Sequence, residues 1–312
     1  MIEEKIVIGK DTEFPLNGLL TLPEGDNAPF PAVIFVHGSG VSDMDSKVFA
    51  IRPFKDFAEG LAKVGVACIR YDKRFFTHAK KIGKMKTQIT AKEEAIEDAI
   101  LAANILKEDP RIDSSKIFIA GLSLGGYLAP RIADEYGKFA GMILLAAPAR
   151  RLEVVMKDQM DDPKLKKPRG LLGLIVKSQM KKLLAKLENL YEISDEEAKN
   201  IPFGNGVSAY YFKDMGKKQV SEYLESNNIP ILVLHGNEDF QVSTEKDFNE
   251  YKRILQNRQN ATFKLYPDLN HVFMPSVCGP LKSPKKEYSK PQNVVNYVIT
   301  DLANWIHSIY KL

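Results

Sequence analysis

Short apolar runs that alternate with longer helical patterns constrain the fold of this chain of 312 residues more than any other feature. Two half-buried antiparallel strands are expected first, at Glu4–Gly9 and Gly18–Pro23, and a continuous apolar strand follows at Pro31–His37. Further strands are predicted at Val66–Tyr71, Lys116–Ala120, Gly141–Ala147, Pro230–His235 and Ala261–Tyr266, with helices at about Phe49–Val64, Ala91–Lys107, Gly125–Tyr136, Thr244–Leu255 and Val294–Tyr310. Strands that alternate with helices form parallel sheets covered on both faces, so we predict an α/β fold with a mostly parallel central sheet.

Residues 151–225 interrupt this alternation, which divides the chain into a core at 1–150 and 226–312 and an insertion between them. The insertion has no strand-like apolar run. Apolar residues at spacings of three and four predict one helical stripe, formed by Leu172, Val176, Met180, Leu183, Leu187 and Leu190. Eight basic residues between 164 and 186 precede an acidic block at 188–197. We interpret the insertion as a helical lid over the sheet edge; contact with a membrane surface or an anionic partner is the alternative.

Composition excludes several classes of protein. The 44 Lys and Arg residues against 40 Asp and Glu leave a net charge of +4 without a basic stripe, which argues against a nucleic-acid partner. Two cysteines cannot staple a fold of this size, and free thiols are typical of a reducing compartment. The longest apolar run, Phe139–Ala149, is too short to cross a membrane. The N-terminus lacks signal-peptide features, so we expect a cytoplasmic protein, with a removed leader as the alternative.

The sharpest chemical signal is Gly121-Leu-Ser-Leu-Gly-Gly126, which follows one predicted strand directly and precedes a helix. A G-x-S-x-G sequence in this setting is typical of a tight turn that exposes a nucleophilic serine at the strand end. The turn places Ser123 in strained backbone, and the glycines avoid collisions. The neighbouring helix N-terminus favours developing negative charge. We therefore predict Ser123 as the nucleophile.

A serine hydroxyl needs a base, which is usually histidine. Of five histidines, His271 is selected because it lies on the loop after the last strand, whereas the others end buried strands, lie in an earlier loop or belong to the closing helix. The order Ser…Asp…His places the orienting acid after the strand Pro230–His235. Asp239 is our choice there, and its neighbour Glu238 is the alternative.

An oxyanion hole requires two backbone N–H groups. One is expected from Leu124, directly after the nucleophile, and the other from Ser39 in the glycine-rich turn His37–Gly40. The sequence predicts no cofactor, because no phosphate-binding loop occurs and the turn lacks the third glycine of a dinucleotide fingerprint. Neither Cys68 nor Cys278 has metal-ligand spacing, so no metal is predicted.

Three charged residues, Asp72, Lys73 and Arg74, end the strand Val66–Tyr71. A solvated or salt-bridged loop is the simpler interpretation of this group. A role at the edge of the substrate site is the alternative.

Taken together, the motifs resemble the α/β-hydrolase superfamily, and within it serine esterases related to dienelactone hydrolase and to prolyl oligopeptidase catalytic domains. The matching stretches are HGSG at 37–40, RYDKR at 70–74, DPRID at 109–113, GLSLGG at 121–126, AAPAR at 146–150, HGNEDFQV at 235–242 and LNHVF at 269–273. One departure is Leu122, where many relatives have histidine. The resemblance implies the α/β-hydrolase fold, with the insertion placed where these enzymes have lids.

The expected function is hydrolysis of a small-molecule carboxylic ester through an acyl-enzyme intermediate. The same residues serve peptidases, amidases and thioesterases, so these stay as alternatives, together with a catalytically silent binding protein of this fold. A homodimer is left open as an alternative to a monomer.

Overall fold

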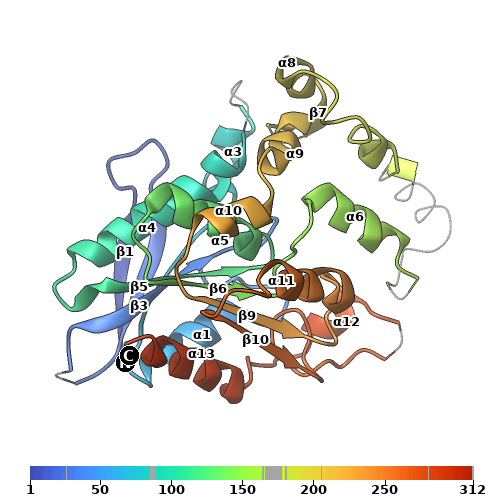
Figure 1. Ribbon diagram of the computed structural model, residues 1–312. Coiled ribbons are helices and arrows are strands. Elements are labelled where there is room, and N and C mark those ends of the chain that lie inside the picture. Colours follow the sequence, from blue (N-terminus) through green and yellow to red (C-terminus); the bar gives the residue numbers. More distant parts are fainter. Residues whose placement is uncertain are drawn as a thin grey trace.

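The computed structural model describes residues 1–25, 27–84, 89–163, 165, 178–179, 181–204, 206–279 and 281–310. An eight-stranded sheet runs through the molecule in the order β1-β2-β4-β3-β5-β6-β9-β10 (Figure 1). Its strands are β1 (Ile2–Ile8), β2 (Leu16–Leu22), β3 (Phe30–Val36), β4 (Ala67–Tyr71), β5 (Ile112–Leu122), β6 (Gly141–Leu145), β9 (Ile231–Gly236) and β10 (Ala261–Tyr266). Strand β2 pairs antiparallel with β1 and β4, and the other pairs are parallel. The predicted α/β fold with a mostly parallel sheet is confirmed.

Helices cover both faces of the sheet (Figure 1). One face carries α1 (Pro53–Ala62) and α13 (Asn296–Ser308), and the other carries α4 (Glu97–Glu108), α5 (Leu124–Tyr136), α10 (Val220–Ser226) and α11 (Asn249–Ile254). The remaining short elements of the core are α2 (Arg74–Thr77), α3 (Ala79–Ile82), α12 (Pro284–Tyr288) and the π-helical turns η1 (Lys92–Ile96) and η2 (Thr244–Phe248).

Alternating side chains of β3 show how the sheet divides the core. Val33 and Phe35 belong to the cluster under α1 and α13, whereas Ile34 and Val36 belong to the cluster under α4 and α5. All four side chains are at most 1% exposed. A strand buried on both faces must be apolar at every position, which explains the unbroken apolar run in the sequence.

The strand register brings several strand ends to one level of the sheet. Gly121 of β5 pairs with Val36 of β3, and Leu122 pairs with Leu145 of β6. Because parallel strands end at the same edge, the residues that follow β3, β5, β9 and β10 gather at one rim of the sheet. All predicted site residues follow one of these four strands.

The described residues of the predicted insertion at 151–225 lie together on one side of the sheet (Figure 1). Its described elements are α6 (Leu152–Asp161), α8 (Asp195–Lys199), β7 (Pro202–Gly204), β8 (Val207–Ser208), α9 (Ala209–Gly216) and most of α10. Although the sequence of this segment has no strand-like apolar run, β7 and β8 form a small antiparallel pair, which the prediction of a helical insertion missed. At three and two residues, they are too short to produce an alternating pattern. Of the predicted apolar stripe, Leu172, Val176 and Met180 lie outside the described residues, as do five of the eight basic side chains.

One predicted helix is shorter than its apolar pattern. Helix α1 begins at Pro53 instead of near Phe49. Ser46 and Phe49 have positive φ angles of 55° and 50°, which a right-handed helix excludes.

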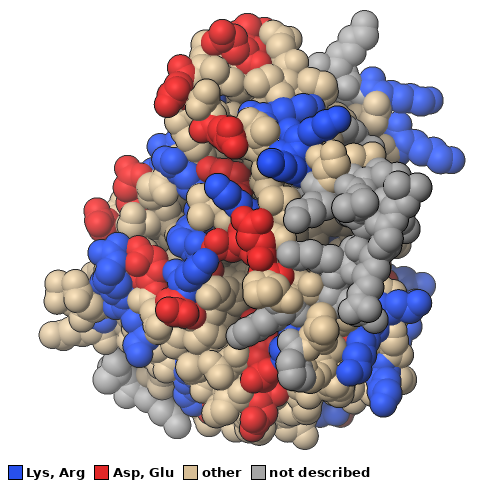
Figure 2. Space-filling view, turned by 90° about the vertical axis from the view of Figure 1, so that its right-hand side faces the viewer, with Lys and Arg blue, Asp and Glu red and all other residues tan. Residues whose placement is uncertain are grey.

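The distribution of charged side chains on the described surface is consistent with the small net charge. Basic and acidic side chains are interspersed over the face shown in Figure 2. Among the helices within the described ranges, none is long and apolar enough to cross a membrane.

Candidate active site

Ser123 lies at the turn from β5 into α5, with φ 56° and ψ −120°. This is a strained conformation for a residue with a side chain, as the sequence predicted. Both flanking glycines are required by space. A Cβ on Gly121 would lie 2.1 Å from the carbonyl oxygen of Gly125, and a Cβ on Gly125 would lie 2.2 Å from the carbonyl oxygen of Val36. The backbones of β3, β5 and α5 therefore meet around this turn, which presents the half-buried Ser123 at the rim.

The turn after β3 lies against the serine. A Cβ added to Gly38 would be 3.3 Å from Cβ of Ser123, so this turn approaches the nucleophile closely. Ser39, the predicted second oxyanion donor, follows in the same turn and is exposed. Leu124, the predicted first donor, is the first residue of α5, and its N–H has no acceptor within the helix.

His271 is oriented by Asp239. Its Nδ1 lies 2.7 Å from Oδ2 of Asp239, and the two side chains are 5% and 0% exposed. The other four imidazoles each hydrogen-bond a backbone carbonyl instead: His37 that of Tyr71, His78 that of Pro15, His235 that of Val242 and His307 that of Val64. The structure thus brings together the histidine and the acid that the sequence singled out.

No hydrogen bond joins Ser123 to His271 within the described residues. Catalytic hydrogen bonds are often long until substrate binds. What the structure places together is therefore the His271–Asp239 pair, with Ser123 at the same rim of the sheet.

The two loops that carry Asp239 and His271 touch through Gly236. A Cβ on Gly236 would lie 2.3 Å from the carbonyl oxygen of Leu269 and 2.5 Å from that of Asn270. The N–H of Glu238 also donates to Leu269 at 2.9 Å. The glycine therefore permits the close approach that brings the acid within reach of the base.

Asn270 shapes the loop that carries the base. Its side-chain oxygen accepts from the N–H groups of Val272 and Met274, both at 3.1 Å, and its Nδ2 donates to Glu287 at 3.0 Å. Phe273, inside this loop, has a positive φ of 61°. A fully buried amide with all these partners fixes a backbone that would otherwise be unfavourable.

Electrostatics favours a charged Asp239. Burial raises the pKa of its carboxyl, but attraction to the His271 ring in its protonated form, the hydrogen bond from that ring and the N–H of Val242 outweigh burial and hold the pKa below its usual value. The N–H groups of Gln241 and Val242 donate to Oδ1 at 2.7 and 3.0 Å, which leaves Oδ2 for the imidazole. The pKa of His235, whose Nε2 is 3.6 Å from Oδ2, is lowered mainly by burial.

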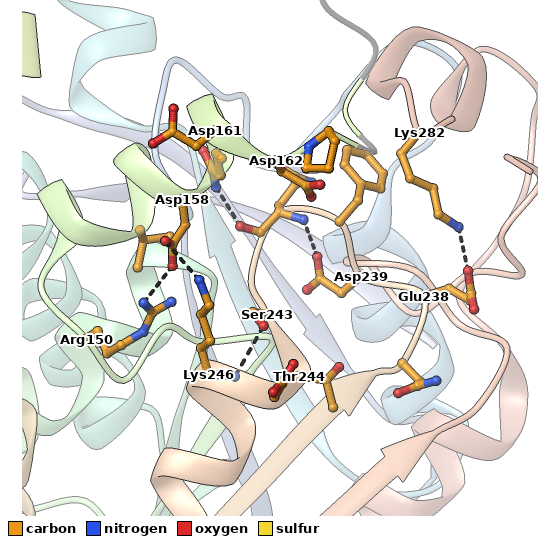
Figure 3. Close-up of a pocket in the computed structure, with 17 residues that line it drawn as sticks. Arg150, Asp158, Asp161, Asp162, Glu238, Asp239, Ser243, Thr244, Lys246 and Lys282 are labelled. Atoms are coloured by element: carbon orange, nitrogen blue, oxygen red, sulfur yellow. Dashed lines mark hydrogen bonds and ion pairs between the residues drawn. The ribbon is translucent and has the colours of Figure 1, made fainter. Parts of the chain in front are cut away.

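Glu238, the alternative acid, points elsewhere. It pairs with Lys282 at 2.5 Å, and both line a pocket of about 500 Å³ between α6 and the loop after β9 (Figure 3). Of the described residues that line this pocket, only Asp239 belongs to the predicted site. The rest are mostly charged or polar, and several are paired with one another, such as Arg150 and Lys246 with Asp158. Neither Ser123 nor His271 is among the residues that line this pocket.

Asp72, Lys73 and Arg74 are buried, so the solvated interpretation is wrong; the salt-bridged one is confirmed for Lys73 and Arg74, whereas Asp72 accepts from the N–H of Met44. Lys73 pairs with Glu94, and Arg74 pairs with Asp98. Lys73 also donates to the carbonyl oxygen of Gly38, in the turn beside the serine, at 2.8 Å. Sequence reasoning missed Glu94, because nothing local marks a glutamate in a helical pattern as the partner of a lysine in another element.

Among the described residues, no cluster of His, Cys, Asp and Glu side chains has the arrangement of a metal site.

The fold, the strained serine turn and the buried His–Asp pair at one rim define an α/β hydrolase. The family described as serine aminopeptidase, S33, matches residues 28–275, and the chain belongs to this family.

Similar proteins agree with this assignment. The esterase EstD of Thermotoga maritima is 37% identical over 303 residues, which cover 95% of this chain and 67% of EstD. Est1E from Butyrivibrio proteoclasticus superposes with a TM-score of 0.59 at 17% identity, over 97% of this chain and 99% of Est1E. Dipeptidyl peptidase 4 from Porphyromonas gingivalis gives 0.57 at 17% identity, over 98% of this chain and 35% of the peptidase. The two structures show the fold alone. The predicted class, an α/β hydrolase with an esterase as relative, is confirmed.

Proposed function

We propose that this chain hydrolyses carboxylic esters of small molecules, with Ser123 as nucleophile, His271 as base and Asp239 as the acid that orients the base. The observation that carries this proposal is the strained φ of 56° at Ser123, at the same rim as the fully buried Asp239 bound to His271. Strained backbone persists where the surroundings impose it, and it is concentrated at functional sites. The name of the 37% identical relative, an esterase, favours esters over other acyl compounds.

In the first half-reaction, Oγ of Ser123 attacks the ester carbonyl carbon while Nε2 of His271 takes the hydroxyl proton. Asp239 accepts the hydrogen bond from Nδ1–H, which keeps Nε2 unprotonated in the resting state and stabilises the imidazolium that forms. The bond from the carbonyl carbon to the leaving oxygen then breaks, and the imidazolium gives its proton to the departing alcohol. The acyl group stays on Ser123.

In the second half-reaction, a water molecule attacks the acyl carbon and His271 takes its proton. The carboxylic acid leaves, and Ser123 recovers its proton. Each tetrahedral intermediate carries negative charge on the former carbonyl oxygen, and the N–H groups of Leu124 and Ser39 are the donors proposed to bind it. Removal of one such donor costs about 10²- to 10³-fold in kcat in other hydrolases.

Residues 151–225 are proposed as a lid on a core formed by 1–150 and 226–312. Two contacts tie this segment to α5, which begins at the nucleophile turn. Arg131 of α5 pairs with Asp214 at 2.8 Å, and the hydroxyl of Tyr127 donates to the carbonyl oxygen of Met215 at 3.4 Å. The proposed lid is therefore in direct contact with the helix that begins next to Ser123.

Hydrolysis of short p-nitrophenyl esters tests the proposed function. The purified protein is expected to release p-nitrophenol, and Ser123→Ala is expected to abolish release while near-UV circular dichroism stays native. Labelling of wild-type protein by a fluorophosphonate, absent in Ser123→Ala, provides a readout independent of substrate choice. Undiminished turnover in folded Ser123→Ala would refute the assignment of the nucleophile.

Amide hydrolysis is the second candidate, because the matched family is described as serine aminopeptidase. The proposed residues could act on either bond. Rates on an ester and an aminoacyl anilide with the same acyl group separate the two. If kcat/KM were larger for the anilide than for the ester, the protein would be a peptidase and the ester proposal would be wrong.

A further inference from the structure

Lys73 reaches from the end of β4 to the turn that carries the proposed oxyanion donor. Its Nζ donates to the carbonyl oxygen of Gly38 at 2.8 Å, and its backbone N–H donates to the carbonyl oxygen of Ser42 at 3.0 Å. Its neighbour Asp72 accepts from the N–H of Met44 at 2.8 Å. The two residues after β4 therefore brace the whole segment from 38 to 44, which leads away from β3.

The carbonyl of Gly38 and the N–H of Ser39 belong to one planar peptide unit. In a trans peptide the C=O and N–H bonds point in opposite directions, and neither can turn without the other. A hydrogen bond that holds the Gly38 oxygen on one side therefore fixes the direction of the Ser39 N–H on the other side. Turns rich in glycine otherwise tolerate rotation of such a unit, and Gly40, one residue further, has a φ of 88°.

The lysine is held by a chain of buried partners. Its Nζ lies 2.7 Å from Oε1 of Glu94, with side-chain exposures of 3% and 9%. The hydroxyl of Tyr211, from α9 of the insertion, donates to Oε2 of the same carboxylate. Both oxygens of Glu94 are thus occupied, and the chain runs from the insertion through Tyr211, Glu94 and Lys73 to the carbonyl of Gly38.

A buried ion pair is a poor source of stability, because apolar side chains of similar volume often do as well or better. The presence of this pair beside the nucleophile turn is better explained by the backbone that it positions. A charged donor on the Gly38 carbonyl also polarises the peptide, which strengthens the N–H on its other side as a donor.

We propose that Lys73 is a positioning residue of the oxyanion hole, which sets the Ser39 N–H through the Gly38 carbonyl, and that Tyr211 couples this setting to the insertion. The inference rests on the proposed function, since it concerns the oxyanion hole of that reaction. It adds a residue that touches neither the substrate nor the reacting atoms.

The test compares two buried ion pairs on consecutive residues. Lys73→Met combined with Glu94→Gln removes the lysine without leaving a buried charge, and a Gln oxygen still accepts from Tyr211. The matched control, Arg74→Met combined with Asp98→Asn, removes a pair with side-chain exposures of 6% and 2%, and the hydrogen bonds of Arg74 go to Glu97 and Asp98. Kinetics on a p-nitrophenyl ester are measured for both variants and for wild type.

The Lys73 variant is expected to lose about 10- to 100-fold in kcat with KM within about threefold of wild type, since one oxyanion donor is misplaced while ground-state binding stays. Affinity for a trifluoromethyl ketone, whose adduct with serine carries an oxyanion, should fall by the same factor. The control variant should keep the wild-type kcat and the wild-type affinity for the trifluoromethyl ketone. Unchanged kcat in the folded Lys73 variant, or equal losses in the control, would overturn the proposal.

Tyr211→Phe provides a second variant that leaves the ion pair intact. We expect a smaller loss of kcat, about two- to tenfold, with KM unchanged. This variant decides the question if the Lys73 variant does not fold, because an unaltered kcat in Tyr211→Phe would then contradict the proposal. Failure of the proposed function is separate, because it would show as absent or Ser123-independent turnover in the wild-type protein.

Discussion

Nε2 of His235 lies 3.6 Å from Oδ2 of Asp239, the same oxygen that binds His271. The proposed catalytic acid is therefore close to a second imidazole besides that of His271. Its Nε2 also contacts the carbonyl oxygen of Val242 at 3.1 Å, and since a carbonyl only accepts, this nitrogen carries the proton. Burial lowers the pKa of His235, so the ring stays neutral. Oδ2 of Asp239 thus lies near the N–H of a neutral imidazole, that of His235, as well as near the ring of the proposed base.

Asp239→Asn is expected to lower kcat by about 10³- to 10⁴-fold with little change in KM. The amide of asparagine would donate to Nδ1 of His271, which forces the ring proton onto Nε2. That tautomer cannot accept the proton of Ser123. Steady-state kinetics on a p-nitrophenyl ester check this expectation.

Glu238→Gln is the matched control for the neighbouring acid. Glu238 pairs with Lys282 and makes no contact with His271 among the described residues, so its neutralisation should leave kcat within about twofold of wild type. The reverse ranking of the two variants would assign the orienting role to Glu238.

The central sheet and the strained turn at Ser123 could be predicted because their signals are local. Strand runs, glycine spacing and the position of Ser123 between a strand and a helix all lie within short stretches of sequence. The choice between Glu238 and Asp239 could only be expressed as a preference, because adjacent acids share the same local context. The contacts decide the orientation: Oδ1 of Asp239 accepts two loop N–H groups, which turns Oδ2 toward His271.

The network around Lys73 could not be predicted from the sequence. Glu94 is 21 residues away and Tyr211 is 117 residues beyond Glu94, so no spacing rule connects them. Its members look like ordinary surface charges and a helical aromatic residue. Similarly, the apolar pattern before α1 predicted helix across Phe49, because periodicity reports which face is apolar and not the sign of φ.

Gly236→Ala is expected to impair activity and stability together. The new Cβ would lie 2.3 Å from a backbone oxygen of the loop that carries His271, so the two loops must move apart. Overpacking of this kind costs about 1–3 kcal/mol in the free energy of unfolding. Separation of Asp239 from His271 should lower kcat at least about tenfold in the protein that remains folded. Urea unfolding and ester kinetics measure the two effects.

Gly279→Ala serves as the control, because a Cβ at that position meets no atom of the described residues within 4 Å. It should behave as wild type in both measurements. Full activity and stability in Gly236→Ala would show that the two loops do not depend on this close approach.

His37 should make the protein less stable in acid. Burial first, and then the charge of Lys73, lower the pKa of His37 to about 3, despite the hydrogen bond to the Tyr71 carbonyl. In the unfolded chain the pKa is about 6.5. Between these values the unfolded state binds a proton that the native state does not, so the free energy of unfolding falls as pH falls, by about 1.4 kcal/mol per pH unit from this group.

His37→Gln retains an N–H donor for the Tyr71 carbonyl and removes the titrating ring. Its free energy of unfolding should therefore fall less steeply than that of wild type between pH 6.5 and about 4, with the two curves converging or crossing on acidification. His235 and the carboxylates contribute equally to both proteins and cancel in the difference. Urea unfolding at a series of pH values gives that difference directly. Parallel curves would mean that His37 is not held neutral in the native protein.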